Sequence, residues 1–176
     1  TDDEGVAQGS PLSPLFGNVL LYDFDVQFNK DGVICVRFID DFVLLSKEER
    51  RVTKAFQSAK AHLEKLGLKC HDPFANASKE KAQRGKVDDG FVFLGYDVRP
   101  GLLQPAARAR NDLLKSVKDR IKIGKRNISV IRREPSADNT QRYAQTLVGI
   151  DRALRGWGNA FAYGNAPATL DDLDMK

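Results

Sequence analysis

The sequence predicts an α+β protein in which antiparallel hairpins packed on helices occupy residues 1–103, and a basic helical segment occupies residues 104–176. Two observations support this division. Apolar runs rich in β-branched and aromatic residues alternate with turn signals before residue 103, whereas helical spacing of apolar residues begins at Pro105. With 41% hydrophobic residues, the 176-residue chain has enough apolar material for a sizeable core.

Composition excludes several classes of protein. No stretch approaches 18 consecutive apolar residues, so a transmembrane helix is not expected. The sequence has no basic segment followed by an apolar run, so a signal peptide is not expected either. The two cysteines, Cys35 and Cys70, stand among apolar residues and lack metal-ligand spacing. We therefore expect two buried free thiols in a cytoplasmic protein.

The first elements are a loop and a helix. Residues 8–11 are predicted to form a loop. Ser13 and Pro14 then predict the start of a helix, with Ser13 as the N-cap, and helical spacing extends it to about Phe28. A turn cluster follows at residues 29–32.

Two apolar runs, residues 33–38 and 42–45, flank an acidic turn and predict a β-hairpin. Because the runs are nearly continuous, we expect both faces of the hairpin to be covered. Adjacent carboxylates at Asp40 and Asp41 repel each other, and a divalent cation would relieve the repulsion. Aspartate is also common in ordinary solvated turns, so this motif alone leaves both interpretations open.

The elements that follow are predicted from caps and periodicity. Residues 46–49 predict a capping box that opens a helix ending at Gly67, followed by a short strand at 68–71 and a polar loop at 73–90. A strand at 91–98 and a return strand at 102–103 come next. A helix at 105–123, a linker at 124–139 and a second long helix complete the chain. The apolar stripe of that second helix consists of Tyr143, Leu147, Ile150, Leu154, Trp157 and Phe161.

Charge is unevenly distributed along the chain. Residues 1–100 contain 14 Lys and Arg against 16 Asp and Glu, whereas residues 101–176 contain 14 against 8. This basic excess predicts either a surface that binds a polyanion such as nucleic acid or a solvated helix face. Charge alone leaves both possibilities open.

Three motifs in this order resemble the reverse transcriptase family, specifically its bacterial group II intron-like lineage, which includes retron and maturase proteins. The motifs are Gln8-Gly9-Ser10-Pro11-Leu12-Ser13-Pro14, Phe38-Ile39-Asp40-Asp41 and Phe93-Leu94-Gly95-Tyr96. The resemblance extends over residues 5–165. It implies a partial polymerase palm over residues 1–103 and a helical thumb over residues 104–176.

The resemblance implies RNA-directed DNA polymerase activity by two-metal nucleotidyl transfer, with Mg²⁺, an RNA template, a DNA primer and dNTP. Asp40 and Asp41 would be the catalytic metal-binding residues, with Asp40 a direct ligand. The residues lining the nucleotide and template pocket would be Gln8, Gly9, Ser10 and Pro11. The primer grip would be Phe93, Leu94, Gly95 and Tyr96. The residues binding nucleic acid in the thumb would be Arg108, Lys115, Lys118, Lys122, Lys125 and Arg126.

Three further features of the sequence correspond in part to the family pattern. Phe38 stands where Tyr is commoner, and the missing hydroxyl is not needed for metal binding. The family's lysine after the first palm helix has a degenerate equivalent here, so Lys79 or Lys81 is either a helper of pyrophosphate departure or a solvated loop lysine. The segment with Trp157 and Phe161 resembles a thumb or maturase-proximal helix, and we expect core packing there rather than RNA stacking.

One family feature is not found in the sequence. The family's other metal-binding Asp lies on a strand some tens of residues before the Gln-Gly loop, and only seven residues precede Gln8. We therefore expect that this chain alone, without fingers and that Asp, is inactive. Its exposed palm edge favours a homodimer or strand exchange. The alternative is a non-catalytic RNA-binding relic of a group II intron protein.

Overall fold

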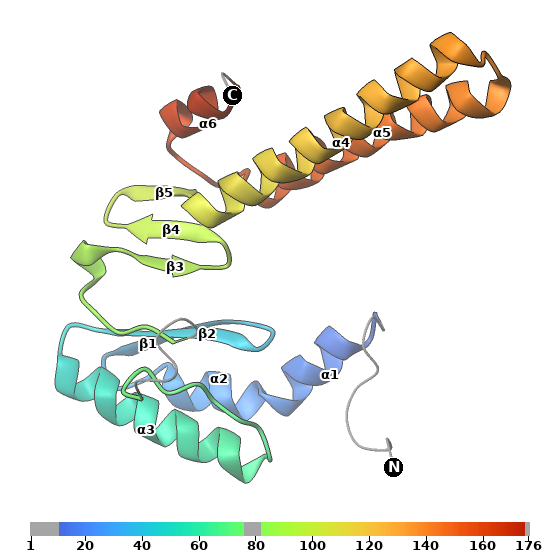
Figure 1. Ribbon diagram of the computed structural model, residues 1–176. Helices are drawn as coiled ribbons and strands as arrows, with labels where there is room; N and C mark the ends of the chain where they lie inside the picture. Colours follow the sequence, from blue (N-terminus) through green and yellow to red (C-terminus); the bar gives the residue numbers. More distant parts are fainter. Residues whose placement is uncertain (1–10, 76–81, 175–176) are drawn as a thin grey trace. The chain divides into compact units, whose positions relative to one another are not determined.

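The computed structural model describes residues 11–75 and 82–174. In this part of the chain there are six α-helices and two small antiparallel sheets (Figure 1), which confirms the predicted α+β class. The chain divides into two compact units, Thr1–Gln83 and Arg84–Lys176. The functional division at residue 103 stays a prediction. None of the helices described is both long and apolar enough to cross a lipid bilayer.

The first unit combines helices with one hairpin. In chain order, its elements are α1 (Ser13–Leu20), α2 (Tyr22–Phe28), β1 (Val33–Phe38), β2 (Asp41–Ser46) and α3 (Glu49–Lys65). The sequence predicts one helix to Phe28, but the structure interrupts it at Leu21, where a ψ of 13° leaves the helical region. The predicted N-cap is also wrong, because Leu12 occupies that position and α1 begins at Ser13.

One face of the β1–β2 hairpin packs on α2 and α3. The core of this unit consists of Leu21, Phe24, Phe28, Cys35, Ala59 and Leu63, with Phe42, Leu44 and Cys70 packed against it. Alternation along β1 places Cys35 in this core and leaves Ile34 and Val36 exposed on the other face. Burial raises the pKa of the Cys35 thiol to about 11. The expectation that both faces are covered is met on one face only within this unit.

The ends of α3 test two predictions of local structure. The helix ends at Lys65, and Gly67 closes it as predicted, because Gly67 adopts a φ of 75° and the Leu68 amide donates to the Leu63 carbonyl at 2.9 Å. The predicted capping box does not form. Glu48 is the N-cap without a side-chain bond, and the Ser46 hydroxyl instead donates to the Gly32 carbonyl at 2.9 Å. Residues 68–71 are not a strand.

The second unit combines a three-stranded sheet with long helices. Its elements are the 3₁₀ turn η2 (Val87–Asp89), β3 (Phe91–Phe93), β4 (Tyr96–Arg99), β5 (Leu102–Pro105), α4 (Ala107–Arg133), α5 (Ala137–Ala160) and α6 (Pro167–Asp174). The strands pair antiparallel in the order β3-β4-β5. The sequence predicts a single strand at 91–98, but a turn at Leu94-Gly95 divides it into β3 and β4.

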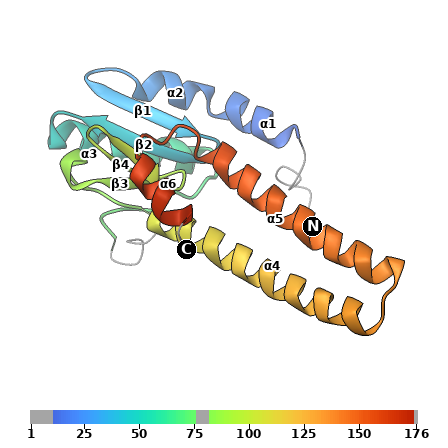
Figure 2. The same ribbon diagram turned by 90° about the horizontal axis from the view of Figure 1, so that it is seen from above.

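Helices α4 and α5 lie side by side and antiparallel (Figures 1 and 2). The predicted linker at 124–139 is wrong for most of its length, because α4 continues to Arg133. Gly124 does not break the helix. It is buried against α5, and a Cβ there would lie 3.6 Å from Thr146 Cγ2. On α5, Tyr143, Ile150 and Trp157 are half-buried, whereas Leu147 and Leu154 of the predicted stripe are exposed.

Candidate functional site

Asp40 and Asp41 lie at the tip of the β1–β2 hairpin. Phe38 and Asp41 form its last cross-strand pair, so Ile39 and Asp40 are the two residues of the turn. Six residues of β1 pair with six of β2, and this pairing holds the turn in place. Both aspartates are exposed. The hairpin therefore presents two neighbouring carboxylates to solvent at the end of two short, regularly paired strands.

The turn contains an unfavourable backbone conformation. Ile39 has a φ of 57°, and only Asp31 and Leu94 share a positive φ with it among the non-glycine residues described. A β-branched residue rarely adopts this region because its Cβ crowds the backbone. A positive φ at the first central residue and not at the second is the pattern of a type II′ turn, for which glycine is preferred.

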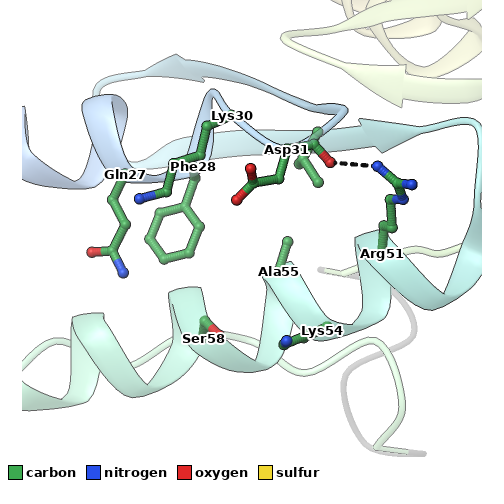
Figure 3. A pocket seen from close by; sticks show the side chains of 9 residues that line it. Gln27, Phe28, Lys30, Asp31, Arg51, Lys54, Ala55 and Ser58 are labelled. Atoms are coloured by element: carbon green, nitrogen blue, oxygen red, sulfur yellow. Dashed lines mark hydrogen bonds between the residues drawn. The ribbon is translucent and has the colours of Figure 1, made fainter.

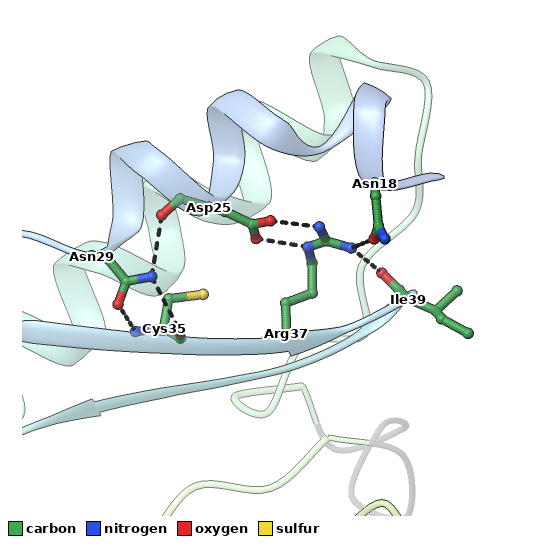
Figure 4. Close-up of polar contacts among 6 residues, drawn as sticks. All are labelled: Asn18, Asp25, Asn29, Cys35, Arg37 and Ile39. Atoms are coloured by element: carbon green, nitrogen blue, oxygen red, sulfur yellow. Dashed lines mark hydrogen bonds and ion pairs between the residues drawn. The ribbon is translucent and has the colours of Figure 1, made fainter. Parts of the chain in front are cut away.

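Arg37 connects this turn to the helices beneath it (Figure 4). Its Nε donates to Asp25 Oδ1 at 2.7 Å and its Nη2 donates to Asp25 Oδ2 at 2.5 Å. Its Nη1 donates to the carbonyl oxygen of Ile39 at 2.7 Å and to Asn18 Oδ1 at 3.2 Å. The Arg37 side chain is 6% exposed. A two-pronged ion pair and two further bonds thus join β1, the turn and both N-terminal helices.

Asp25 stabilises the charged form of Arg37. The hydrogen bond with Asp25 raises the pKa of Arg37, although burial acts in the opposite direction. Asn29 forms a second clamp between α2 and β1, since its side chain donates to the Cys35 carbonyl at 3.0 Å and accepts from the Cys35 amide at 2.9 Å. Neither Arg37 nor Asn29 belongs to one of the three sequence motifs. A charged residue within an apolar strand was the available signal for Arg37, because burial of a charge requires a partner.

The third motif lies in the other unit, at the turn between β3 and β4. Phe93 and Tyr96 form the closing pair, and Leu94 and Gly95 both have positive φ, the pattern of a type I′ turn. The Tyr96 hydroxyl donates to the Ala160 carbonyl at 2.8 Å, which attaches the hairpin to the end of α5. A Cβ on Gly95 would lie 3.2 Å from Phe161 Cζ, so this close approach favours glycine.

An aromatic cluster surrounds that attachment. The Phe161 ring centroid lies 4.9 Å from that of Tyr96 and 4.7 Å from that of Trp157. Trp157 Nε1 donates to the Ala109 carbonyl of α4 at 3.3 Å. Trp157 and Phe161 are half-buried and pack within this unit. The expectation that they do not stack on RNA stays a prediction.

The sequence match decides the family. Residues 2–98, more than half of the chain, match the model of the family described as reverse transcriptase (RNA-dependent DNA polymerase). The chain belongs to the reverse transcriptase family. The matched range includes the acidic turn and the β3–β4 turn of this reverse transcriptase chain. No curated protein matches it.

The donor chemistry of the acidic turn fits Mg²⁺. Mg²⁺ in nucleotide-dependent enzymes takes one or two carboxylates from the protein and its remaining oxygens from phosphates and water. Asp40 and Asp41 supply this number and type of donor on the reverse transcriptase hairpin. Across residues 11–75 and 82–174, no cluster of three or more His, Cys, Asp or Glu side chains is suitable for a metal ion.

A pocket of the same unit lies away from the acidic turn (Figure 3). Its lining residues are Gln27, Phe28, Lys30, Asp31, Val33, Arg51, Lys54, Ala55 and Ser58. Val33 begins β1, whereas the acidic turn follows the end of β1 at Phe38. At a rise of about 3.3 Å per residue, these ends are roughly 17 Å apart. The pocket is therefore separate from the two carboxylates of the reverse transcriptase motif.

The first motif lies only partly within the described residues. Gln8, Gly9 and Ser10 are outside them, as are Lys79 and Lys81. Pro11 is described, and it is exposed just before α1 begins. The role of these residues in a nucleotide pocket therefore stays a prediction from the motif.

The basic residues predicted to bind nucleic acid share one side of α4. All of them are exposed. They are Arg108, Lys115, Lys118, Lys122, Lys125 and Arg126, joined by Arg132 and Arg133. At 3.6 residues per turn, these positions fall within roughly 120° of arc. Gly124, which contacts α5, is on another side of the helix, so this basic face of α4 is free of the helix pairing.

Proposed function

We propose that this reverse transcriptase-family chain takes part in RNA-directed DNA synthesis by two-metal nucleotidyl transfer, with Asp40 and Asp41 as metal ligands. The observation that supports this most directly is the acidic turn, which stands exposed on a paired hairpin and is bonded to Arg37. When bound there, Mg²⁺ would lower the pKa of the primer 3′-hydroxyl and stabilise the leaving pyrophosphate. The hairpin contributes by limiting the positions that the carboxylates can adopt.

The other motifs support roles in substrate binding. Gln8, Gly9, Ser10 and Pro11 would line the site of the incoming dNTP and the template. Residues 93–96 would grip the primer end, and the attachment of that turn to α5 through Tyr96 and the aromatic cluster suits this role. We assign the chain to the group II intron-like lineage of the family on the order of the three motifs.

The basic face of α4 supports binding of a template–primer duplex. Phosphate contacts by lysine and arginine give salt-sensitive binding without sequence preference. An RNA–DNA hybrid would be recognised by its shape and backbone, since its deep groove hides the base edges. In this proposal α4 and α5 form the thumb.

A metal-binding experiment tests the proposed site independently of turnover. Mn²⁺ is added to ¹⁵N-labelled chain, and paramagnetic broadening of the backbone amides is measured. We expect broadening at Asp40 and Asp41 that Asp40→Asn removes. The matched control is Asp88→Asn, which changes an exposed aspartate of η2. Broadening that persists in Asp40→Asn, or that is absent from the turn, contradicts the assignment.

Primer extension measures catalysis by the chain itself. With Mg²⁺, dNTP and a primed RNA template, we expect no extension by these 176 residues alone; robust extension would show that expectation to be wrong while supporting the family activity. The alternative function is a non-catalytic RNA-binding relic, which would use the basic face of α4 and needs neither carboxylate. The intact Asp40-Asp41 turn therefore favours the polymerase. A relic would bind the hybrid but show no Mn²⁺ broadening at Asp40.

We also retain the proposal of a homodimer or strand exchange. The hairpin forms a two-stranded sheet among the described residues, and Ile34, Val36 and Phe38 are 58%, 45% and 57% exposed on its outer side. Unpaired strand edges favour pairing with another chain. Light scattering over a range of concentrations measures this, and a monomer throughout would contradict it.

A further inference from the structure

We infer that Arg37 is a positioning residue that fixes the direction of Asp40 by binding the carbonyl oxygen of Ile39. The inference deepens the proposed function and rests on it. Arg37 lies three residues before Asp40 and is directed towards the helices, not towards solvent (Figure 4). It therefore acts through the turn and is not itself expected to contact substrate.

The guanidinium uses all three nitrogens, each in a defined direction. Nε and Nη2 bind the two oxygens of Asp25 and so fix the plane of the group. Nη1 is then directed at the Ile39 carbonyl, at 2.7 Å. Because the guanidinium is planar and rigid, anchoring two nitrogens on α2 determines where the third points. The position of the Ile39 carbonyl is therefore fixed relative to α2 as well as by its own hairpin.

The orientation of this carbonyl decides the type of turn. In a type II′ turn only the first central residue has a positive φ, and in a type I′ turn both do. The two types differ by rotation of the central peptide, which here joins Ile39 to Asp40. Aspartate tolerates a positive φ better than most residues, so Asp40 alone would not prevent the rotation. A bond from Arg37 to the Ile39 carbonyl stabilises one orientation and disfavours the other.

The same group connects the turn to the segment after the first motif. Nη1 also donates to Asn18, which lies on α1, the helix that begins at Ser13 in the Gln8–Pro14 motif. Arg37 therefore bonds at once to α1, α2 and the acidic turn. Displacement of α1 would alter the contact of Nη1 and, through it, the support of the peptide before Asp40.

Arg37→Lys separates positioning from folding. An ammonium can keep the charge pair with Asp25, but it cannot reach Asp25, Asn18 and the Ile39 carbonyl with fixed geometry. The matched control is Arg51→Lys. Arg51 Nη1 donates at 2.9 Å to the carbonyl of Asp31, another residue with positive φ, at the far end of the same hairpin. The control therefore removes an equivalent arginine–turn bond away from the aspartates.

Two measurements on the ¹⁵N-labelled chain report on the turn. Relaxation dispersion detects interconversion of turn conformers on the microsecond to millisecond timescale. We expect Arg37→Lys to introduce it at Ile39 and Asp40, with none in the parent chain or in Arg51→Lys. Mn²⁺ titration should show binding at Asp40 weakened by about tenfold in Arg37→Lys and unchanged in Arg51→Lys. Far-UV circular dichroism checks the fold of each variant.

A second variant covers the case in which Arg37→Lys does not fold. Asn18→Ser removes only the hydrogen bond from Arg37 Nη1 to Asn18 Oδ1. We therefore expect dispersion at the amides of Ile39 and Asp40 with smaller amplitude. The inference is wrong if neither variant shows dispersion at the turn, or if Arg37→Lys and Arg51→Lys bind Mn²⁺ equally. If the parent chain shows no Mn²⁺ broadening at Asp40, the proposed function fails, and the dispersion measurement still decides whether Arg37 fixes the turn.

Discussion

Ile39 adopts a backbone conformation that its side chain disfavours, which leads to a prediction at the scale of single residues. At ordinary positions glycine is less stabilising than alanine, because it loses more conformational freedom on folding. At the φ of 57° found for Ile39 the order should reverse. We expect Ile39→Gly to be more stable than Ile39→Ala by about 1 kcal/mol. Native-state hydrogen exchange of the β1 and β2 amides measures the difference.

Val36 provides the control for that comparison. It lies on β1 and is 45% exposed, close to the 41% of Ile39, but it is not among the residues with positive φ. Val36→Gly should therefore be less stable than Val36→Ala. Alanine proving the more stable replacement at both positions would contradict the strain assigned to Ile39.

At this scale the sequence predicts the carboxylates but not their support. Asp40 and Asp41 are recognisable because their motif is known from a family and stands in that family's order with two other motifs, not because an acidic turn is unusual by itself. Arg37 is not recognisable in the same way, since its partners Asp25 and Asn18 are 12 and 19 residues away in sequence. Periodicity gives the face on which a side chain lies, but not which distant atom it meets.

At the scale of elements, Gly124 gives a prediction of increased stability. It is buried within α4, yet a Cβ there would meet Thr146 Cγ2 at 3.6 Å and Tyr143 Cε2 at 3.8 Å, which are ordinary contact distances. We expect Gly124→Ala to stabilise the helix pair by about 1 kcal/mol, because alanine is the better helix former. Urea denaturation followed by fluorescence of Trp157, the single tryptophan, measures this.

Gly156 separates helix propensity from packing. It lies within α5 with nothing near the position of a Cβ, so Gly156→Ala should give a similar gain from propensity alone. A bulkier replacement distinguishes the two positions. Gly124→Leu should destabilise by overpacking against α5, whereas Gly156→Leu should not. Destabilisation by Gly124→Ala would contradict the contact distances.

Gly124 also shows why the end of α4 could not be predicted from the sequence. Glycine within a basic stretch indicates a helix end, but at Gly124 the missing side chain serves the approach of α5, which local sequence does not reveal. The helix from Ser13 is interrupted at Leu21 without a proline or glycine to signal it. By contrast, the hairpin at residues 33–46 is predicted well, because both its apolar runs and its turn are local signals.

At the scale of the whole chain, the unequal division of charge requires an explanation. Residues 101–176 contain the basic excess, and the exposed basic residues of α4 occupy one side of the helix. Helix stability does not require like charges on one side, since neighbouring like charges at a spacing of four repel. Lys118 and Lys122 have that spacing. Binding of a polyanion would offset this cost, whereas a solvated face gives no reason for the arrangement.

Salt dependence distinguishes these two explanations. Binding of a fluorescent RNA–DNA hybrid is measured by anisotropy over a range of KCl concentrations, with the chain and with Lys118→Gln. If Lys118 contacts a phosphate, the slope of log K against log[salt] should become shallower by about 0.9, because one fewer counterion is released. Lys118→Gln combined with Lys122→Gln should lower the slope by about twice that amount.

Arg152→Gln is the matched control for this experiment. Arg152 is exposed on α5, and at about 100° per residue it lies about 180° from Tyr143 and about 120° from Thr146, the two residues of α5 nearest Gly124. It removes the same charge from the same unit without touching the basic face of α4, so its slope should equal that of the parent chain. Equal reductions for Arg152→Gln and Lys118→Gln would mean that net charge and not this face determines binding. An unchanged slope for Lys118→Gln would mean that Lys118 contacts no phosphate. A shallower slope confined to Lys118→Gln would place phosphate contacts on the basic face of α4.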